Sequence, residues 1–282
     1  MKISKITILI VLCTLNVFGQ TDFYNSNVIH TLKIKNCKIY TYENPNDYKD
    51  SVSKDYITDI IYFNSIGKII KEENYNYTPK PKSIIEFIYE GKKLTKTTTN
   101  DNRKEIIVID STQNSLSKTS IVNNVMQKKN ITYYDSFHRE IKYENYKQDG
   151  SLQFSYIVNY IEKSSTVDKM VKGFLREQTE TISPTSKIIT QFDDNGKATD
   201  KVFQNYYNDG KQKEFCQIMY NGNETDFVFN CQSNYYDDKG RLISEINNGT
   251  EKRYNYNESD LLISYEFIEQ GILRQLSIYK YE

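Results

Sequence analysis

Hydrophobic and polar residues alternate along most of the chain from about residue 60 onward. An apolar or β-branched residue recurs two positions before the residue that leads into each polar turn. The recurring residues are Ile61, Phe87, Ile107, Thr132, Val158, Thr190, Ile218 and Tyr254. A period of two places such side chains on one face of a strand. The pattern predicts an all-β protein made of antiparallel hairpins, with little helix apart from the N-terminal segment.

The residues that end these strands return at a nearly constant interval. The series is Phe63, Tyr89, Ile109, Tyr134, Tyr160, Phe192, Tyr220, Tyr236 and Tyr256. Its mean interval is about 24 residues, which lies in the range of structural repeats. We therefore predict one hairpin-repeat array over residues 59–282, twisted and elongated, with each hairpin packed only against its neighbours.

The best-defined turn of the series runs from Tyr236 to Leu242. Gly240 supplies a residue that tolerates positive φ, and Asp237 can hydrogen-bond the turn backbone. Arg241 and Leu242 open the next strand. The partial copies keep an aromatic residue with an Asp or Gly; their residues are Phe63 and Gly67, Tyr134 and Asp135, and Phe192, Asp193 and Gly196. The alternative is an ordinary antiparallel protein with Asx-Gly turns.

These residues resemble the signature of the YD-repeat (Rhs-type) family, Tyr-Asp-x-x-Gly-Arg-Leu. Residues 236–242 match every specified position, and the other copies match in part. The resemblance implies hairpins joined edge to edge, in arrays that wind into shells or form surface stalks. Eight to ten units are too few to close such a shell by this expectation. A weaker similarity to MORN-like repeats rests on the aromatic-Gly-Lys pattern.

Two segments depart from the repeat pattern. Residues 21–58 contain one strand, a turn at Pro45 and the start of a second strand, so we predict an atypical hairpin that caps the array. Near residues 163–185 the interval between anchors lengthens. There we expect an irregular insertion between hairpins, in which Val167–Phe174 forms a short helix or a loop.

The first twenty residues have the order of a secretory signal. Lys2 and Lys5 precede an apolar run too short to span a bilayer, and Gly19 offers a cleavage position. This predicts a protein exported to the periplasm, the outer surface or the extracellular space. Cys13 raises the alternative of a lipoprotein, but Leu12 stands where a lipid-modifying signal wants a small residue.

Charge and composition narrow the class of partner. Lys plus Arg and Asp plus Glu are both 37, so there is no basic excess to pair with a nucleic-acid backbone. No other stretch is long and apolar enough for a transmembrane helix. The sequence contains 25 tyrosines, whose rings can be buried while their hydroxyls stay hydrated. Aromatic rows of this kind can also bind sugar rings or a protein partner.

Candidate chemistry is sparse. Cys216 and Cys231 flank a turn and are either a disulfide or two reduced thiols; Cys37 is left over. His30 and His138 lie far apart and show no metal-ligand spacing. No nucleophile, metal or phosphate motif is present, so we expect no catalytic residues, metal or cofactor.

The leading prediction for function is a non-catalytic, exported repeat protein of the bacterial cell envelope. It would act as a scaffold or binding surface for a glycan or protein partner. The alternatives are a toxin-associated or immunity-type protein binder and, third, an enzyme acting on envelope glycans.

Overall fold

The computed structural model describes residues 25–43, 57–100, 103–220 and 226–282. Within these ranges the chain forms twenty strands and one short helix, α2 (Ser26–Thr31). The strands are β1 (Asn36–Tyr42), β2 (Ile57–Phe63), β3 (Ile69–Asn74), β4 (Ser83–Glu90), β5 (Lys93–Asn100), β6 (Arg103–Ser111), β7 (Ser115–Val122), β8 (Val125–Tyr134), β9 (Glu140–Tyr146), β10 (Leu152–Glu162), β11 (Thr166–Val171), β12 (Phe174–Ser183), β13 (Ser186–Phe192), β14 (Ala198–Tyr206), β15 (Gln212–Tyr220), β16 (Asp226–Tyr236), β17 (Leu242–Asn247), β18 (Thr250–Tyr256), β19 (Leu262–Glu269) and β20 (Ile272–Tyr281). The predicted all-β, antiparallel hairpin fold is confirmed. No helix in the described part of the chain is long and apolar enough to cross a bilayer.

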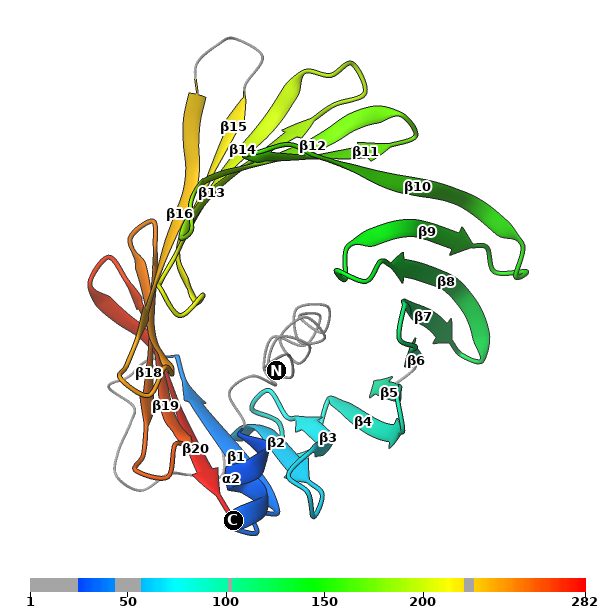
Figure 1. Cartoon of the computed structure of the whole chain (residues 1–282). Coiled ribbons are helices and arrows are strands. Elements are labelled where there is room, and N and C mark those ends of the chain that lie inside the picture. The colour runs from blue at the N-terminus through cyan, green and yellow to red at the C-terminus, as the bar shows by residue number, and fades with distance from the viewer. Residues whose placement is uncertain (1–24, 44–56, 101–102, 221–225) are drawn as a thin grey trace.

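The sheet closes on itself. Each strand pairs antiparallel with the next in the sequence, and β20 pairs with β1, so the meander forms a ring (Figure 1). The seam register sets Cys37 opposite Tyr281 on one side and opposite Ile61 on the other. The expectation that eight to ten units are too few to close was therefore wrong. Closure pairs both terminal edges, so each of the described strands has a neighbour on both sides and offers no free edge for association with another chain.

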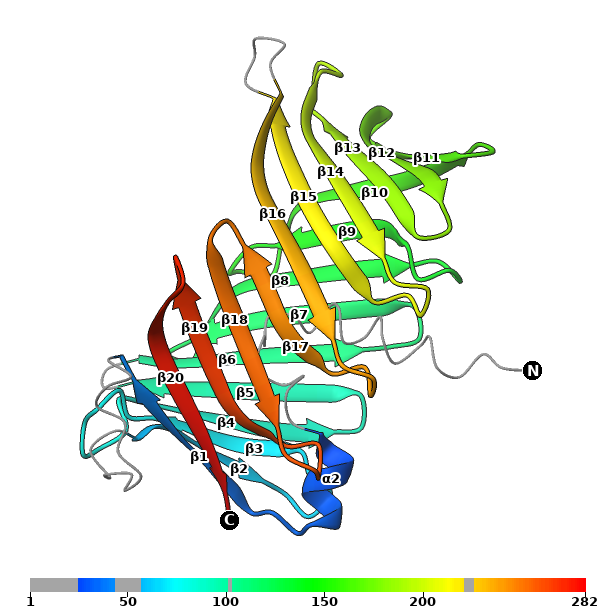
Figure 2. The same cartoon turned by 90° about the vertical axis from the view of Figure 1, so that its left-hand side faces the viewer.

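The N-terminal region does not cap an open end. β1 lies between β2 and β20, and α2 precedes it beside the C-terminal end of β20 (Figure 2). The backbone N–H groups of Lys35 and Asn36 both donate to the carbonyl of Glu282. Where we predicted a capping hairpin over residues 21–58, the described residues of that range place β1 as the strand that joins the two ends of the array. The predicted signal of residues 1–20 lies outside the described residues.

The turns lie on two edges of the ring, and the predicted repeat anchors other than Phe192 and Tyr220 lead into turns on only one of them. We call this the motif edge; it carries turns 64–68, 135–139, 207–211, 237–241 and 257–261. Phe192 ends β13 and Tyr220 ends β15, so both lie at the opposite edge. Their places in the motif-edge series are taken by the β12–β13 turn and by Tyr206. The mean interval between anchors from Phe63 to Tyr256 stays about 24 residues, because the number of anchors between these two is the same in both series.

The predicted insertion near residues 163–185 is wrong. β11 and β12 form a regular hairpin there, with Val171 opposite Phe174. Its two-residue turn places Lys172 at φ 53° and Gly173 at φ 83°. Both values suit the turn type that matches the twist of paired strands. Lys is uncommon in that conformation, which is why the sequence pattern did not indicate a turn.

Buried apolar side chains gather where the ring closes. The main cluster joins Ile29 of α2 to β1, β2, β3 and β4; its members are Ile29, Cys37, Ile39, Ile61, Phe63, Ile69, Phe87 and Leu261. Ile29, Cys37 and Ile61 are almost fully buried. Much of the remaining sheet is half-buried, as expected of a single layer in which Tyr contributes much of the apolar surface.

Candidate functional site

The strict repeat turn is held by its own aspartate. Oδ1 of Asp237 accepts the backbone N–H groups of Lys239, at 3.0 Å, and Arg241, at 2.9 Å. The N–H of Gly240 donates to the carbonyl of Asp237, with Gly240 at φ +77°. A β-bulge between Tyr235 and Tyr236 precedes the turn. Asp237 therefore determines the shape of the loop, and its carboxylate oxygens accept hydrogen bonds from the loop itself.

Arg241 ties this turn to the next repeat. Its Nε donates to Oδ2 of Asp237 at 2.6 Å, and its Nη1 donates to Oδ1 of Asp260 at 2.8 Å. The guanidinium lies 4.6 Å from the centre of the Tyr256 ring, within the range of a cation–π contact. Burial opposes ionisation of Asp237, but the hydrogen bonds and charge of Arg241 outweigh it and lower the pKa of that carboxyl.

The same arrangement is repeated at Asp135. Oδ1 of Asp135 accepts the N–H groups of Phe137 and Arg139, and Arg139 lies 4.6 Å from the centre of the Tyr160 ring. His138 takes the glycine position at φ 59°. His138 is thus a turn residue, since it occupies the left-handed position that Gly240 fills in the strict copy.

The other two copies keep the turn and lose the arginine. Asn64 replaces the aspartate beside Phe63, and its Oδ1 accepts the N–H groups of Ile66 and Lys68. Asp193 caps Asn195 and Lys197 in the same way, with Gly196 at φ +77°. The Asp193 turn lies at the opposite edge, so equal turn chemistry does not identify the edge.

A ladder of tyrosine hydroxyls links successive repeats along the motif edge. Each hydroxyl donates to a backbone carbonyl at the start of the strand that follows the preceding motif-edge turn. The pairs are Tyr89 to Ile69, Tyr160 to Glu140, Tyr236 to Gln212, Tyr256 to Leu242 and Tyr281 to Leu262, at 2.8–3.3 Å. Burial raises the pKa of Tyr256 to about 12, so the phenol stays protonated and donates. This ladder was not predicted, although the recurring Tyr was its signal in the sequence.

Two carboxylates form matching clusters with tyrosine hydroxyls and a lysine. Oε2 of Glu73 accepts the hydroxyls of Tyr62 and Tyr75, while its Oε1 lies 2.6 Å from Nζ of Lys71. Glu144 makes the same three contacts with Tyr133, Tyr146 and Lys142. Burial raises the pKa of Tyr62 to about 12, and the Glu73 carboxylate adds to that shift. A duplicated cluster of this kind holds neighbouring strands together.

A group of three contacting aromatic rings lies on β9 and β10. The rings of Tyr143 and Tyr156 stack with centres 5.1 Å apart, and Phe154 lies 5.9 Å from Tyr143. Phe154 is 44% exposed. Beside these rings is a hollow of about 310 Å³ whose polar lining comes from Gln127, Lys128, Asn145, Tyr146, Lys147 and Gln153. Aromatic rings beside amides and hydroxyls can bind a partner by stacking and hydrogen bonding.

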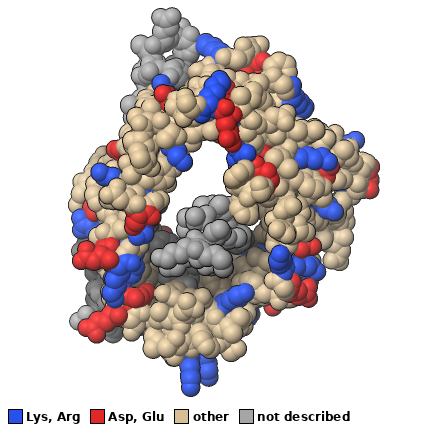
Figure 3. Space-filling model, in the orientation of Figure 1, with Lys and Arg blue, Asp and Glu red and all other residues tan. Residues whose placement is uncertain are grey.

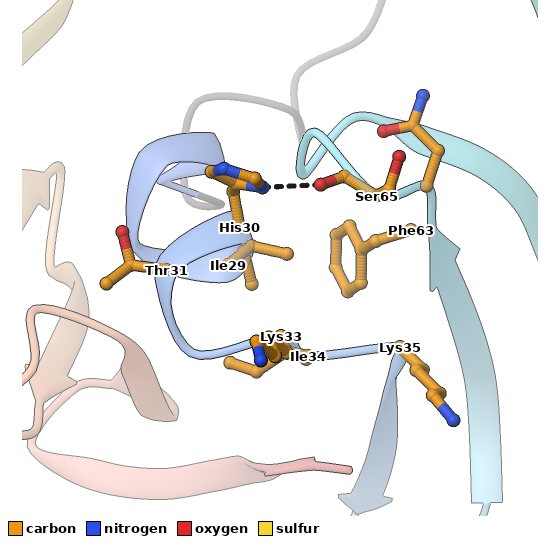
Figure 4. A pocket seen from close by; sticks show the side chains of 9 residues that line it. Ile29, His30, Thr31, Lys33, Ile34, Lys35, Phe63 and Ser65 are labelled. Carbon is orange, nitrogen blue, oxygen red and sulfur yellow. Dashed lines mark hydrogen bonds between the residues drawn. The ribbon is translucent and has the colours of Figure 1, made fainter.

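A larger cavity of about 600 Å³ lies between α2 and the first repeat turn (Figure 4). Ile29, Ile34 and Phe63 form its apolar wall, and Nδ1 of His30 is hydrogen-bonded to the carbonyl oxygen of Ser65 at its top. Lys33 and Lys35 complete the lining on the stretch between α2 and β1. His30 therefore joins helix and turn across the cavity.

The cysteines divide into a bonded pair and a buried thiol. Cys216 and Cys231 form a disulfide between the paired strands β15 and β16. Burial raises the pKa of the Cys37 thiol to about 12. Among the residues that the structure describes, no three His, Cys, Asp or Glu side chains gather as a metal site.

Charges of both signs are mixed over the face shown in Figure 3, and an opening remains at the centre of the ring. No extended patch of one sign is visible on that face. This agrees with the balanced composition, which lacks a basic excess.

No protein-family model matches this sequence, and no curated protein matches it. Among solved structures, the crystal structure of TcdB2-TccC3-TEV is similar over 75% of this chain at 10% identity, with a TM-score of 0.20. A Photorhabdus luminescens Tc holotoxin pore structure is similar over 78% of the chain, at 10% identity and a TM-score of 0.19. The chain spans only 17% and 16% of those two chains. At these TM-scores the overall shapes do not superimpose, so we base no argument on the likeness.

Proposed function

We propose that this protein is an exported, non-catalytic repeat protein of the bacterial cell envelope that presents a binding surface to a glycan or protein partner. One observation carries the proposal: the charged motif residues bind one another. Asp237, Arg241, Asp135 and Arg139 all make intramolecular contacts that hold turns or join repeats. Recognition then falls to surface that these contacts leave uncovered, and the Phe154 region is the best candidate.

The binding test compares two exposed phenylalanines. Mature protein is immobilised and probed with defined envelope oligosaccharides and with secreted proteins of the host. Phe154→Ala removes the exposed ring beside Tyr143. Phe174→Ala, at the start of β12, removes a ring of similar exposure that lies outside the Phe154 hollow. We expect affinity for the true partner to fall about threefold to tenfold for Phe154→Ala, and to stay unchanged for Phe174→Ala. Equal effects of the two changes would contradict a binding role for this surface.

Export has a separate test. The basic, apolar and small-residue order of residues 1–20 supports cleavage near Gly19 or Gln20. Mass spectrometry of protein from its native host should find an N-terminus near Gln20 or Thr21. A retained Met1, or a lipid on Cys13, would refute the secretory signal as we describe it.

The absence of catalysis is tested at the two histidines. Neither has the partners of a general base, because His138 occupies a turn and His30 joins α2 to Ser65. Replacing both by Ala should leave partner affinity within about twofold of the wild type. A catalytic rate that disappears in a folded double variant would overturn the non-catalytic assignment.

A further inference from the structure

The end of the β8–β9 ladder brings two lysines together. The two strands lie side by side, and their pairing ends with Lys129 opposite Tyr146 (Figure 1). Continuing this register by one residue sets Lys128 opposite Lys147, and both lysines are exposed. Residues that stand opposite each other in a sheet have Cβ atoms about 5 Å apart, and like charges there repel. An anion between the two lysines would remove that repulsion.

The surrounding side chains do not neutralise these two charges. Within the described part of the chain, neither Lys128 nor Lys147 takes part in an ion pair or a cation–π contact. Asp149 lies in the same turn as Lys147, but its Oδ1 already accepts the N–H and the hydroxyl of Ser151. Both lysines line the hollow beside Phe154, whose lining contains no Asp or Glu. This local excess of positive charge contrasts with the balanced composition of the whole chain.

Lys128 lies on the same face of the sheet as the exposed Phe154 ring. Nδ2 of Asn145 donates to Oδ1 of Asn130 at 2.7 Å, so these two paired residues share a face. Phe154 stands opposite Asn145 on the other side of β9, and Lys128 precedes Asn130 by two residues on β8. Side chains alternate between the two faces along a strand, so all four residues lie on this face. A ring that is 44% exposed and an ammonium group therefore border one hollow.

The lining indicates the class of ligand. It combines aromatic rings with amides and contains no aliphatic side chain. Nε2 of Gln127 donates to the carbonyl of Val125, which leaves its Oε1 able to accept from a ligand. A sugar presents C–H groups to an aromatic ring and hydroxyls to amides, whereas a protein anchor residue fills a desolvated apolar pocket. The volume of about 310 Å³ lies at the lower end of the range for small-molecule sites, which favours a single sugar unit.

We propose that this hollow binds a sugar unit that carries a carboxylate, a hexuronate of an envelope glycan. Its ring stacks on Phe154, and its carboxylate lies between Lys128 and Lys147. Its hydroxyls form hydrogen bonds with the amides of Gln127 and Gln153. This assignment rests on the proposed function and deepens it, because it chooses an acidic glycan over a protein partner.

Saturation-transfer NMR titration of the full mature chain tests the proposal. The ligands are the methyl glycosides of glucuronic, galacturonic and mannuronic acid, and the matched neutral ligands are the methyl glycosides of glucose, galactose and mannose. We expect at least one uronide to bind with a dissociation constant below about 5 mM, and its neutral counterpart to bind about fivefold more weakly. Raising the NaCl concentration from about 0.05 M to about 0.5 M should weaken uronide binding several-fold and leave hexoside binding unchanged.

Substitutions separate the charge from the ring. Lys128→Gln and Lys147→Gln should each weaken uronide binding about twofold to fivefold, and the double change about tenfold, whereas Lys128→Arg should preserve it. Phe154→Leu keeps an apolar side chain on β10 but removes the ring, so it should weaken uronide and hexoside alike by about threefold. Lys104→Gln, at an exposed lysine of β6 outside the hollow, is the matched control and should leave binding unchanged.

Four results would overturn the assignment. These are no uronide binding at about 20 mM, equal binding of uronide and hexoside, equal effects of Lys128→Gln and Lys104→Gln, and a tri-glutamate peptide that binds as tightly as the uronides. Circular dichroism of every variant confirms that an altered affinity comes from a folded protein.

Failure of this assignment is distinguishable from failure of the proposed function. An envelope partner whose affinity falls in Phe154→Ala, together with no uronide binding, would overturn only the acidic-sugar assignment. If no partner depends on Phe154 and no uronide binds, both fail.

Discussion

Gly67→Ala should destabilise the protein much more than the same change at Gly196. Both glycines occupy the left-handed position of the same turn type, at φ +77°. They differ in surroundings, because a Cβ at Gly67 would overlap the carbonyl of Ser26, whereas a Cβ at Gly196 would meet nothing within 4 Å. Comparing the two variants therefore separates the energetic cost of backbone strain from that of displacing α2.

The magnitude follows from these two contributions. An L-residue in the left-handed region costs about 1–2 kcal/mol, and both variants incur that cost. At Gly67 the helix must also move away, which exposes Ile29, a side chain at 0% exposure. Burying an isoleucine contributes about 1.5–3 kcal/mol. We expect a loss of unfolding free energy of about 1–2 kcal/mol for Gly196→Ala and about 3–5 kcal/mol for Gly67→Ala.

Urea denaturation followed by circular dichroism gives the two free energies, and hydrogen exchange locates the damage. Gly67→Ala should accelerate exchange at the amides of Ile29 and Ile34, whose acceptors are the carbonyls of Asn25 and Ile29. Gly196→Ala should leave those amides protected. Equal losses in the two variants, with Ile29 still protected in Gly67→Ala, would refute the claim that this close contact holds α2.

Three further predictions concern the sheet, the carboxylates and the cysteines. Gly240→Val places a β-branched residue at φ +77° and should lower the free energy of unfolding by on the order of 1–3 kcal/mol. Hydrogen exchange should become faster mainly in β16, β17 and their neighbours. Uniform acceleration around the ring would contradict this prediction. The pKa values of Asp135 and Asp237 are lowered in the folded state. Their contribution to the free energy of unfolding is therefore complete above the unfolded pKa of about 3.9 and is lost as pH falls through the folded pKa. The urea midpoint should drop between about pH 4 and pH 2, and it should drop less steeply in Asp237→Asn. Iodoacetamide at pH 8 should leave Cys37 unmodified until urea unfolds the chain, and rapid labelling of native Cys37 would contradict the structure. A peptide map of the non-reduced protein should contain a Cys216–Cys231 cross-link, and reducing this bond should lower the free energy of unfolding by about 3 kcal/mol. A different cysteine pairing would contradict the structure.

Local chemistry made the hairpins predictable. Alternation identified most strands, and the Asp237 turn was recognisable because Asp and Gly have specific roles in such a loop. The mean repeat length was also predictable, since it depends only on counting anchors. The tyrosine ladder had a visible signal in the recurring Tyr, but its acceptors are backbone carbonyls, which leave no mark on the sequence.

The assignment of turns to edges was not predictable from turn chemistry. Asp193 and Gly196 form the same loop as Asp237 and Gly240, yet they lie at the opposite edge. Whether the number of strands between two turns is odd or even decides the edge, and one unrecognised turn changes that parity. The turn at Lys172 and Gly173 was such a turn, so Phe192 entered the series in place of the β12–β13 turn, and Tyr220 in place of Tyr206.

Closure and the α2 cavity depend on contacts between distant parts of the sequence. β1 and β20 pair across almost the whole chain, and nothing local distinguishes a strand that closes a ring from one that ends an array. The cavity likewise needs Ser26 to meet Gly67 and His30 to meet Ser65. Each of these four residues has an ordinary local role, so their joint effect is a property of the tertiary structure.

The distribution of buried residues gives the closure a physical basis. In an open repeat array the terminal units lack one neighbour and need a cap. Here Cys37 and Ile39 of β1 pack with Ile61 of β2 and Ile29 of α2, so the densest apolar cluster lies at the junction of the two ends. The remaining strands rely on backbone ladders, aspartate-held turns and tyrosine hydroxyls, each a contact between neighbours. A sheet of this kind gains from closing at one well-packed seam, because the last strand then acquires the neighbour that every other strand already has.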